Sequence, residues 1–211
     1  MHIPDGFLDT KTWVSLSLVS GLFLVGSIRR FRGGKSEERI PLIGVTAAFI
    51  FAAQMLNFPI AGGTSGHFMG GVLACILLGP WTGFIALSLV LIVQCLLFQD
   101  GGVTALGANI FNMALVGSVG GSYFYFFFRL LFWGDRTRPV AYALASWFSI
   151  MTAAAFASFE LAVSGTIRLS VGLPAMLGVH WLIGIGEAAV TTAALMLIWK
   201  VKPEIMDLPK Y

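Results

Sequence analysis

The sequence predicts an all-α membrane protein, in which residues 1–211 form one integral-membrane bundle of helices. Of the 211 residues, 57% are hydrophobic and only 11% are charged, whereas an average soluble domain carries about 25% charged residues. No Asp, Glu, Lys or Arg occurs between Arg39 and Asp100, and a transmembrane helix needs about 20 apolar residues. These two observations exclude a soluble enzyme, a disordered chain and a nucleic-acid-binding domain.

We expect seven membrane segments. The first ends in the basic run Arg29-Arg30-Phe31-Arg32, which is typical of a cytoplasmic flank and unlike a signal peptide. The third is short, because it follows a glycine-rich stretch and ends at Gly79-Pro80, where proline interrupts helical hydrogen bonding. Irregular backbone at membrane depth is tolerated where protein buries it or where it lines a cavity. The expected segments are 12–28, 40–57, 68–78, 81–98, 105–128, 139–163 and 177–200.

The positions of the basic residues predict the orientation. With seven spans, the loops after the first and fifth segments and the C-terminal tail share one side, and they hold 11 of the 13 Lys and Arg residues. By the positive-inside rule that side is cytoplasmic, so the N-terminus lies outside. Residues 1–11 and 58–67 would then face the exterior, as would all three histidines, His2, His67 and His180.

Two nucleotide-binding patterns are absent on inspection. Gly34-Lys35-Ser36 resembles the end of a P-loop, but Arg29 stands where that motif needs its first glycine. Gly184-x-Gly186-x-x-Ala189 imitates a dinucleotide fingerprint, but it lies inside a membrane segment, where small residues allow helices to approach closely. We therefore expect no ATP site on this chain, and active transport would need partner subunits.

The most informative feature is Met1-His2. The terminal amine, the backbone nitrogen of residue 2 and the His2 imidazole Nδ1 would close a five- and a six-membered chelate ring around one metal ion. Three coplanar nitrogens suit square-planar Cu(II) or Ni(II), and low-spin Co(II) also adopts this geometry. His67, in a glycine-rich stretch on the same side, is the natural fourth donor. The amine and the backbone nitrogen would release protons, so affinity should fall steeply below neutral pH.

Other polar residues in apolar surroundings are candidates to surround the metal or to line its path. Carboxylates inside a membrane cost several kcal/mol and normally have partners. Glu160 and Glu187 therefore have polar contacts in the simplest interpretation, while a catalytic metal pair of His180 and Glu187 is an alternative. The full set of surrounding or pathway candidates is Asp5, Thr64, Ser65, Asn109, His180 and Glu187.

At this point the sequence resembles a known family. Met-His-Ile-Pro-Asp-Gly at 1–6, Gly-Gly-Thr-Ser-Gly-His at 62–67 and Gly-Gly-Val-Thr-Ala-Leu-Gly-Ala-Asn at 101–109 resemble the CbiM/NikM family. Its members are substrate-binding (S) components of cobalt and nickel energy-coupling-factor transporters. The resemblance implies a six-helix core with an extra N-terminal helix, and a metal held by Met1, His2 and His67.

The resemblance also implies partners: a transmembrane coupling (T) protein, two ATPase subunits and a small two-helix accessory membrane protein. S components dock the coupling protein through small residues on the first core helix. Gly44, Ala48 and Ala52 match this pattern here, although small residues at this spacing also serve ordinary helix packing. The expected function is capture of Co²⁺ or Ni²⁺ as substrate in a prokaryotic plasma (inner) membrane, without enzymatic activity.

Several alternatives remain open from sequence. Planar nitrogen ligation favours nickel, whereas the resemblance favours the cobalt branch and hence a link to cobalamin biosynthesis. An S component for an organic vitamin would share the bundle but would not need a free Met1-His2 terminus. An intramembrane metalloenzyme would depend on His180, Glu187 and Glu160, and a passive channel would need no ATPase partners.

Overall fold

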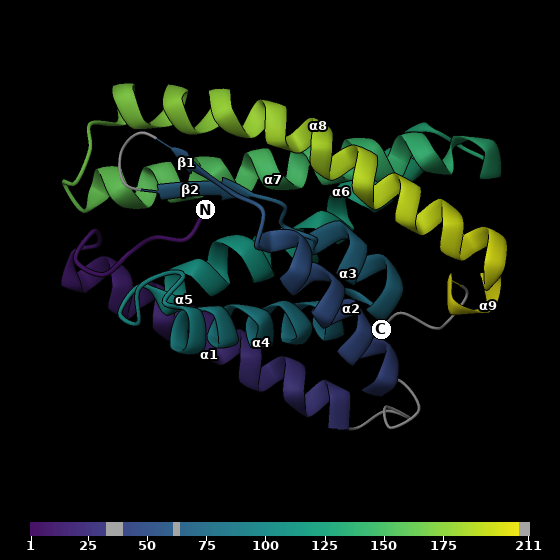
Figure 1. Ribbon diagram of the computed structural model, residues 1–211, viewed down its shortest axis with the longest axis horizontal. Helices are drawn as coiled ribbons and strands as arrows, with labels where there is room; N and C mark the ends of the chain where they lie inside the picture. Colours follow the sequence, from purple (N-terminus) through teal and green to yellow (C-terminus); the bar gives the residue numbers. More distant parts are fainter. Residues whose placement is uncertain (33–39, 61–63, 207–211) are drawn as a thin grey trace.

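The computed structural model describes residues 1–32, 40–60 and 64–206, although not the side chains of 57–65 and 206. Within these ranges the chain is mainly helical (Figure 1). The helices are α1 (Thr10–Arg32), α2 (Ile40–Gln54), α3 (Gly71–Leu78), α4 (Pro80–Phe98), α5 (Leu106–Asn109), the π-helix η2 (Ile110–Gly120), α6 (Gly121–Leu131), the 3-10 turn η3 (Asp135–Thr137), α7 (Arg138–Val163), α8 (Leu169–Val201) and α9 (Pro203–Met206).

The bundle is built around the short helix α3. In Figure 1, α7 and α8 run side by side along one edge, α1 and α4 lie along the opposite edge, and α3 lies between them. All eight residues of α3 are buried. The close packing is permitted by glycine, because a Cβ on Gly71 would lie 2.3 Å from the backbone of Gly117. The core therefore depends on backbone contact between α3 and η2.

Helix length and composition support a polytopic membrane protein. Among the described residues, five helices are long and apolar enough to cross a membrane: Thr10–Arg32, Pro80–Phe98, Leu106–Leu131, Asp135–Val163 and Leu169–Val201. The helix α2 is apolar but has 15 residues, and α3 has eight. The prediction of a multi-helix membrane bundle is thus confirmed, while helix length alone supports five of the seven expected segments.

The segment 58–67, expected from sequence to be a metal-binding loop, contains paired strands in its described residues. Strands β1 (Asn57–Ile60) and β2 (Thr64–His67) pair antiparallel, with Asn57 opposite His67 and Ile60 opposite Thr64. Consequently the expected segment 40–57 ends as a helix at Gln54, and the segment 68–78 is helical from Gly71 only. The segment between α2 and α3 is not helical, so its backbone N–H and C=O groups need other partners. The pairing of β1 with β2 supplies these hydrogen bonds.

Two further boundaries differ from expectation. The helix α8 begins at Leu169, eight residues before the expected start at 177, and it accommodates Pro174 near its N-terminal end. The expected segment 105–128 is continuous but combines α5, η2 and α6, so its middle has π-helical rather than α-helical bonding. Within α8, Gly184 confirms the packing interpretation, since a Cβ there would lie 2.8 Å from the Trp147 ring.

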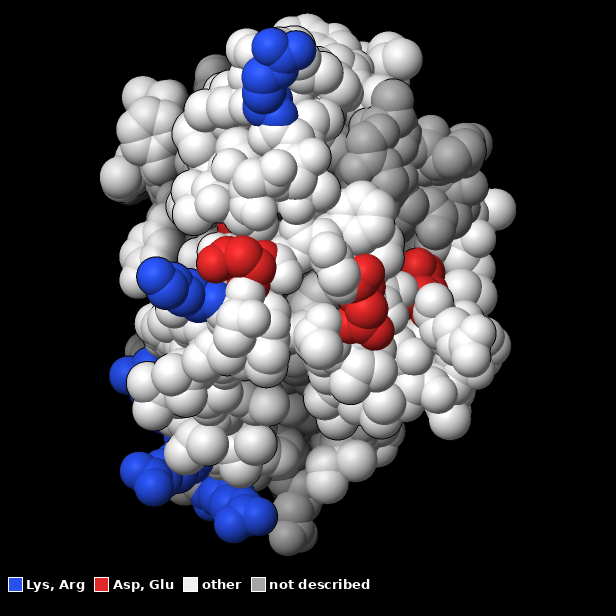
Figure 2. Space-filling view, turned by 90° about the vertical axis from the view of Figure 1, so that its left-hand side faces the viewer, with Lys and Arg blue, Asp and Glu red and all other residues white. Residues whose placement is uncertain are grey.

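Figure 2 shows the end of the molecule at which α1, α5 and α8 begin. Acidic side chains lie near the middle of this face, and most of the remaining surface there is uncharged. Three acidic residues belong to turns at this end: Asp5 and Asp9 precede α1, and Asp100 lies between α4 and α5. This face is where the N-terminal segment enters the bundle.

Candidate metal site

The first three residues are buried inside the bundle. The exposed fractions of Met1, His2 and Ile3 are 0%, 4% and 0%. Asn109 pairs with the Ile3 backbone in both directions: the Ile3 N–H donates to Asn109 Oδ1 at 2.8 Å, and Asn109 Nδ2 donates to the Ile3 carbonyl at 3.1 Å. The Gly102 N–H donates to the same carbonyl at 2.9 Å. The N-terminal segment is therefore held by backbone hydrogen bonds to Gly102, in the loop after α4, and to Asn109, at the end of α5.

Asp5 fixes the next turn of the chain. Its carboxylate accepts the Thr104 N–H at 2.7 Å, the Thr104 hydroxyl, and the Val103 N–H at 3.1 Å. The hydrogen bond from the Thr104 hydroxyl, followed by those from the backbone, lowers the pKa of Asp5. Gly102 allows this approach, because a Cβ there would lie 2.3 Å from the Asp5 nitrogen. Asp5 thus holds backbone and does not lie among the nitrogen donors as a ligand.

The histidine rings of the two expected metal-binding segments meet. The imidazoles of His2 and His67 stack with ring centroids 4.7 Å apart and an angle of 26° between their planes. His2 Nε2 donates to Gln94 Oε1 at 3.1 Å, so the neutral ring carries its lone pair on Nδ1. That Nδ1 lies 3.2 Å from Asp100 Oδ1. A cation at Nδ1 would therefore sit beside a carboxylate.

His67 ends β2 and is fully buried. Its Nδ1 lies 2.6 Å from the Phe68 carbonyl oxygen. Because a carbonyl only accepts hydrogen bonds, Nδ1 carries the proton and Nε2 carries the lone pair. Nε2 is buried without a hydrogen-bond partner among the described residues. The ring is thus held in the tautomer that a metal ligand requires.

Glu187 positions the segment that follows His67. Its two carboxylate oxygens accept the backbone N–H groups of Met69 at 2.6 Å and Gly70 at 2.8 Å, and Gln54 Nε2 donates to the Met69 carbonyl at 2.8 Å. Both oxygens of Glu187 are therefore occupied by backbone, as the interpretation of a polar contact predicts. Glu160, the other membrane carboxylate, accepts from Asn112 Nδ2 at 2.6 Å.

The remaining candidates are distributed as follows. His180 is fully buried on α8, and its Nδ1 bonds the Met176 carbonyl at 2.8 Å. The side chains of Thr64 and Ser65 lie outside the described part of the structure. The small residues Gly44, Ala48 and Ala52 are exposed on α2.

Burial keeps the nitrogen donors neutral. Burial lowers the pKa of the Met1 amine to about 4, although the charge of Asp100 opposes this change. Burial, followed by the charge of the amine, lowers the pKa of His2 to about 3. The same causes, with smaller effects from His2 and His180, hold the pKa of His67 well below its usual value. At neutral pH these nitrogens have lone pairs to offer.

The donor set differs from that of ordinary side-chain metal sites. In the described residues, no group of three or more His, Cys, Asp or Glu side chains is placed to hold a metal ion. A site here would need the amine and backbone nitrogen of the N-terminus together with two imidazoles. Such a mixed set fits a late transition metal, which binds nitrogen strongly.

Two glutamines near the histidines were missed by sequence reasoning. Gln94 fixes the tautomer of His2, and Gln54 fixes the backbone after His67. Both are fully buried. A signal was present, because each is an amide inside an otherwise apolar run, where an unpaired polar group is costly.

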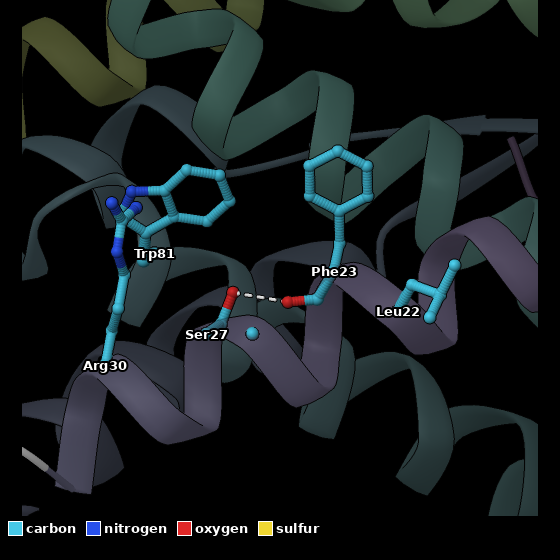
Figure 3. A pocket seen from close by; sticks show the side chains of 6 residues that line it. Leu22, Phe23, Ser27, Arg30 and Trp81 are labelled. Atoms are coloured by element: carbon cyan, nitrogen blue, oxygen red, sulfur yellow. Dashed lines mark hydrogen bonds between the residues drawn. The ribbon is translucent and has the colours of Figure 1, made fainter.

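Two grooves lie between helices, and only the first reaches a proposed donor. Between α2 and α8 a mainly apolar groove of about 560 Å³ reaches His67 and Glu187 from the side. A smaller groove of about 270 Å³ lies between α1 and the start of α4 (Figure 3). There Arg30 lies over the Trp81 ring at 5.0 Å, and Ser27 donates to the Phe23 carbonyl. This second groove contains none of the expected metal ligands.

Comparison with known proteins identifies the family. Residues 2–205 match the family CbiM, described as cobalt uptake substrate-specific transmembrane region. The chain belongs to the CbiM family. It is 45% identical over 210 residues to a protein of Archaeoglobus fulgidus provisionally named fused nickel transport protein NikMN, covering 98% of this chain and 68% of that protein. It is 34% identical over 169 residues to the cobalt transport protein CbiM of Acetoanaerobium sticklandii, covering 78% of this chain and 67% of that protein.

The fold of this CbiM-family chain is that of solved transporters. A crystal structure of a transition metal transporter superimposes with a TM-score of 0.89 and 32% identity, covering 95% of this chain and 93% of the other. A truncated transition metal transporter gives the same TM-score at 31% identity, covering 95% and 99%. The resemblance expected from the sequence motifs is therefore confirmed at the level of the family.

Proposed function

We propose that this CbiM-family chain is the substrate-capture subunit of a Co²⁺ or Ni²⁺ importer. The observation that carries the proposal is the buried contact between the His2 and His67 rings, next to a buried Met1, with each imidazole in the tautomer that a metal needs. The metal would be bound by the amine, the His2 backbone nitrogen, His2 Nδ1 and His67 Nε2. Four nitrogen donors suit square-planar coordination.

Charge supports a dication at this position. Binding converts the His2 backbone nitrogen into an anion, and the Asp100 carboxylate lies beside His2 Nδ1. A dication, one amide anion and one carboxylate sum to zero. A buried charge is tolerated when it is compensated in this way. The site is therefore suited to a divalent cation rather than to an uncharged vitamin.

The transport cycle would require partners. We propose a membrane orientation with the N-terminus outside, so that metal is captured there and released inside. A transmembrane coupling protein, two ATPase subunits and a small two-helix accessory protein would supply coupling and ATP hydrolysis. The exposed residues Gly44, Ala48 and Ala52 on α2 offer a surface of small side chains to the coupling protein. The host membrane is the plasma (inner) membrane of a prokaryote.

The test compares two purified forms of the chain, expressed with cobalt and nickel supplied together. One begins at Met1 and carries its affinity tag at the C-terminus, and the other has two extra residues before Met1. We expect about one metal ion per chain in the first form and none in the second, measured by mass spectrometry. The metal retained shows which of the two ions the purified chain prefers, and divalent affinity normally rises from cobalt to nickel at a given site. Equal metal content in both forms would exclude the amine as a ligand.

A ligand variant and a control variant complete the test. His67→Gln should lose metal, since an amide binds these ions far less strongly than imidazole. Thr152→Val is the control: the Thr152 hydroxyl bonds the Phe148 carbonyl within α7, which carries no proposed donor, so this variant should retain metal. A chain that binds metal equally well as His67→Gln would contradict the proposed ligand set.

A further inference from the structure

The helix α8 carries a small set of buried polar side chains. Its buried polar residues are His180, Glu187 and Thr191. The Glu187 carboxylate accepts hydrogen bonds from the N–H groups of Met69 and Gly70, two and three residues after His67. His180 lies seven residues before Glu187, on about the same face of the helix and about 10 Å along its axis. The helix α8 also contacts β2, the strand that ends at His67.

The His180 ring has one nitrogen in use and one that is not. Nδ1 donates to the Met176 carbonyl at 2.8 Å, so Nε2 carries a lone pair. Nε2 is buried and has no hydrogen-bond partner in the described ranges, and the residue is 0% exposed. A buried acceptor without a donor is costly, and native proteins rarely keep one without a reason.

Electrostatics place this nitrogen near the site. The charges of both the Met1 amine and His180 help to hold the pKa of His67 below its usual value. Asp100 lies close enough to the amine that its charge acts on the pKa of that group. The charge of the amine also acts directly on His180. The amine therefore has both the Asp100 carboxylate and the His180 imidazole in its surroundings.

The chemistry of a bound amine creates a need for two acceptors. When a neutral amine gives its lone pair to a metal, two N–H donors remain. In a buried site each of them needs an acceptor. The Asp100 carboxylate is suited to one, and the second N–H requires another acceptor that is neutral and buried.

We propose that His180 Nε2 accepts a hydrogen bond from the metal-bound Met1 amine and so directs its lone pair toward the metal. His180 is then a positioning residue and not a ligand. The inference rests on the proposed function, because it assigns a partner to one of the four proposed ligands. Partners of this kind commonly affect metal affinity by 10- to 100-fold.

Two substitutions separate the nitrogens of His180. His180→Asn keeps a donor near the position of Nδ1, so it retains the bond to Met176 but lacks the far acceptor. His180→Gln places an amide oxygen near the position of Nε2. We expect Ni²⁺ affinity to fall about 10- to 100-fold in the Asn variant and to stay within about threefold in the Gln variant. A purely structural role for His180 predicts the reverse order.

The readouts are the affinity for Ni²⁺, measured by chelator competition, and the visible absorption of the bound ion. The absorption should be unchanged in both variants, because the four nitrogen ligands are unchanged. Thr191→Val is the control: Thr191 Oγ1 is also buried on α8 without a hydrogen-bond partner among described residues, and we expect no change in affinity.

Three results would overturn the inference. Equal affinity in the wild type and the Asn variant would remove His180 from the site while leaving the proposed function intact. Loss of a nitrogen splitting in the low-spin Co(II) electron spin resonance spectrum of both variants would make His180 an axial ligand. A wild-type chain that binds no metal would overturn the inference together with the proposed function.

Discussion

The imidazole of His2 lies face to face with that of His67, with 4.7 Å between ring centroids. The contact joins the N-terminal segment to β2. In a square of four nitrogens, Nδ1 of His2 and Nε2 of His67 occupy neighbouring corners, and both lone pairs must point at the metal. Rings this close together can both reach a single ion.

Metal binding should release about one proton per ion between pH 5 and 8. The amine pKa of about 4 and the His2 pKa of about 3 mean that these groups are already unprotonated in this range, so only the backbone N–H is displaced. Affinity should then rise about tenfold per pH unit, and more steeply below about pH 4 as the amine takes up a proton. Titration in weakly buffered solution with a pH indicator measures the proton count.

This predicted count is lower than the expectation from sequence, in which the amine also releases a proton. With the ordinary amine pKa of 8.0, about two protons would be released below pH 8. A count of two would show that the N-terminus is not buried before the metal arrives.

Asp5→Asn should weaken metal binding without changing the ligands. The carboxylate accepts from Val103 and Thr104 and so fixes the segment that carries three of the four donors. We expect an affinity loss of about tenfold, the scale found for residues that orient ligands, and an unchanged absorption spectrum of the bound ion. Asp9→Asn is the control, since Asp9 accepts the Thr12 N–H at the start of α1.

Gly102→Ala should displace the N-terminal segment. The new Cβ would lie 2.3 Å from the Asp5 nitrogen, so backbone must move, and overpacking of this kind costs about 1–3 kcal/mol. Metal affinity should fall accordingly while the helical content stays constant in circular dichroism. Gly21→Ala in α1, where nothing lies within 4 Å of the added Cβ, should bind metal normally.

Glu187→Gln should destabilise the chain more than it affects the coordination of the metal. An amide replaces one of two oxygens that accept from Met69 and Gly70, and hydrogen bonds to charged groups contribute about 1.5–3 kcal/mol. The midpoint of thermal unfolding should fall clearly. If the midpoint is unchanged and uptake into cells is lost, Glu187 belongs to the metal path instead.

Replacing Ala48 and Ala52 together by Leu should separate capture from coupling. Both residues are exposed on α2, so larger side chains are accommodated by this chain but would prevent close approach of a partner helix. We expect normal metal content and loss of co-purification with the coupling protein. Gly178→Leu, at an exposed position of α8, should leave co-purification intact.

Sequence predicted the membrane class, the long helices and the convergence of His2 with His67. These follow from strong local signals: long uncharged runs, basic flanks and the unusual Met1-His2 opening. The hairpin of β1 and β2 was not predicted, because a short Gly- and Ser-containing stretch carries no clear period, and pairing between strands depends on the surrounding bundle.

The roles of the polar residues could be assigned only from the three-dimensional structure. Sequence placed Glu187 and His180 on one helical face, but it did not show that Glu187 holds the backbone after His67. Nor did it show that Asn109 binds Ile3 or that Gln94 binds His2, since these contacts join residues far apart in the chain. Long-range partners of buried polar groups depend on tertiary packing, which local pattern does not encode.

The donors stand on two separate supports. Three proposed ligand nitrogens belong to Met1 and His2, which are tied through Ile3 to the end of α5. The fourth belongs to His67, which is tied to α8 and α2 through the residues that follow it. A shift of one support against the other would change the coordination number from four to three in a single movement. The ion could thus be released by a relative movement of the N-terminal segment and β2, without unfolding of either.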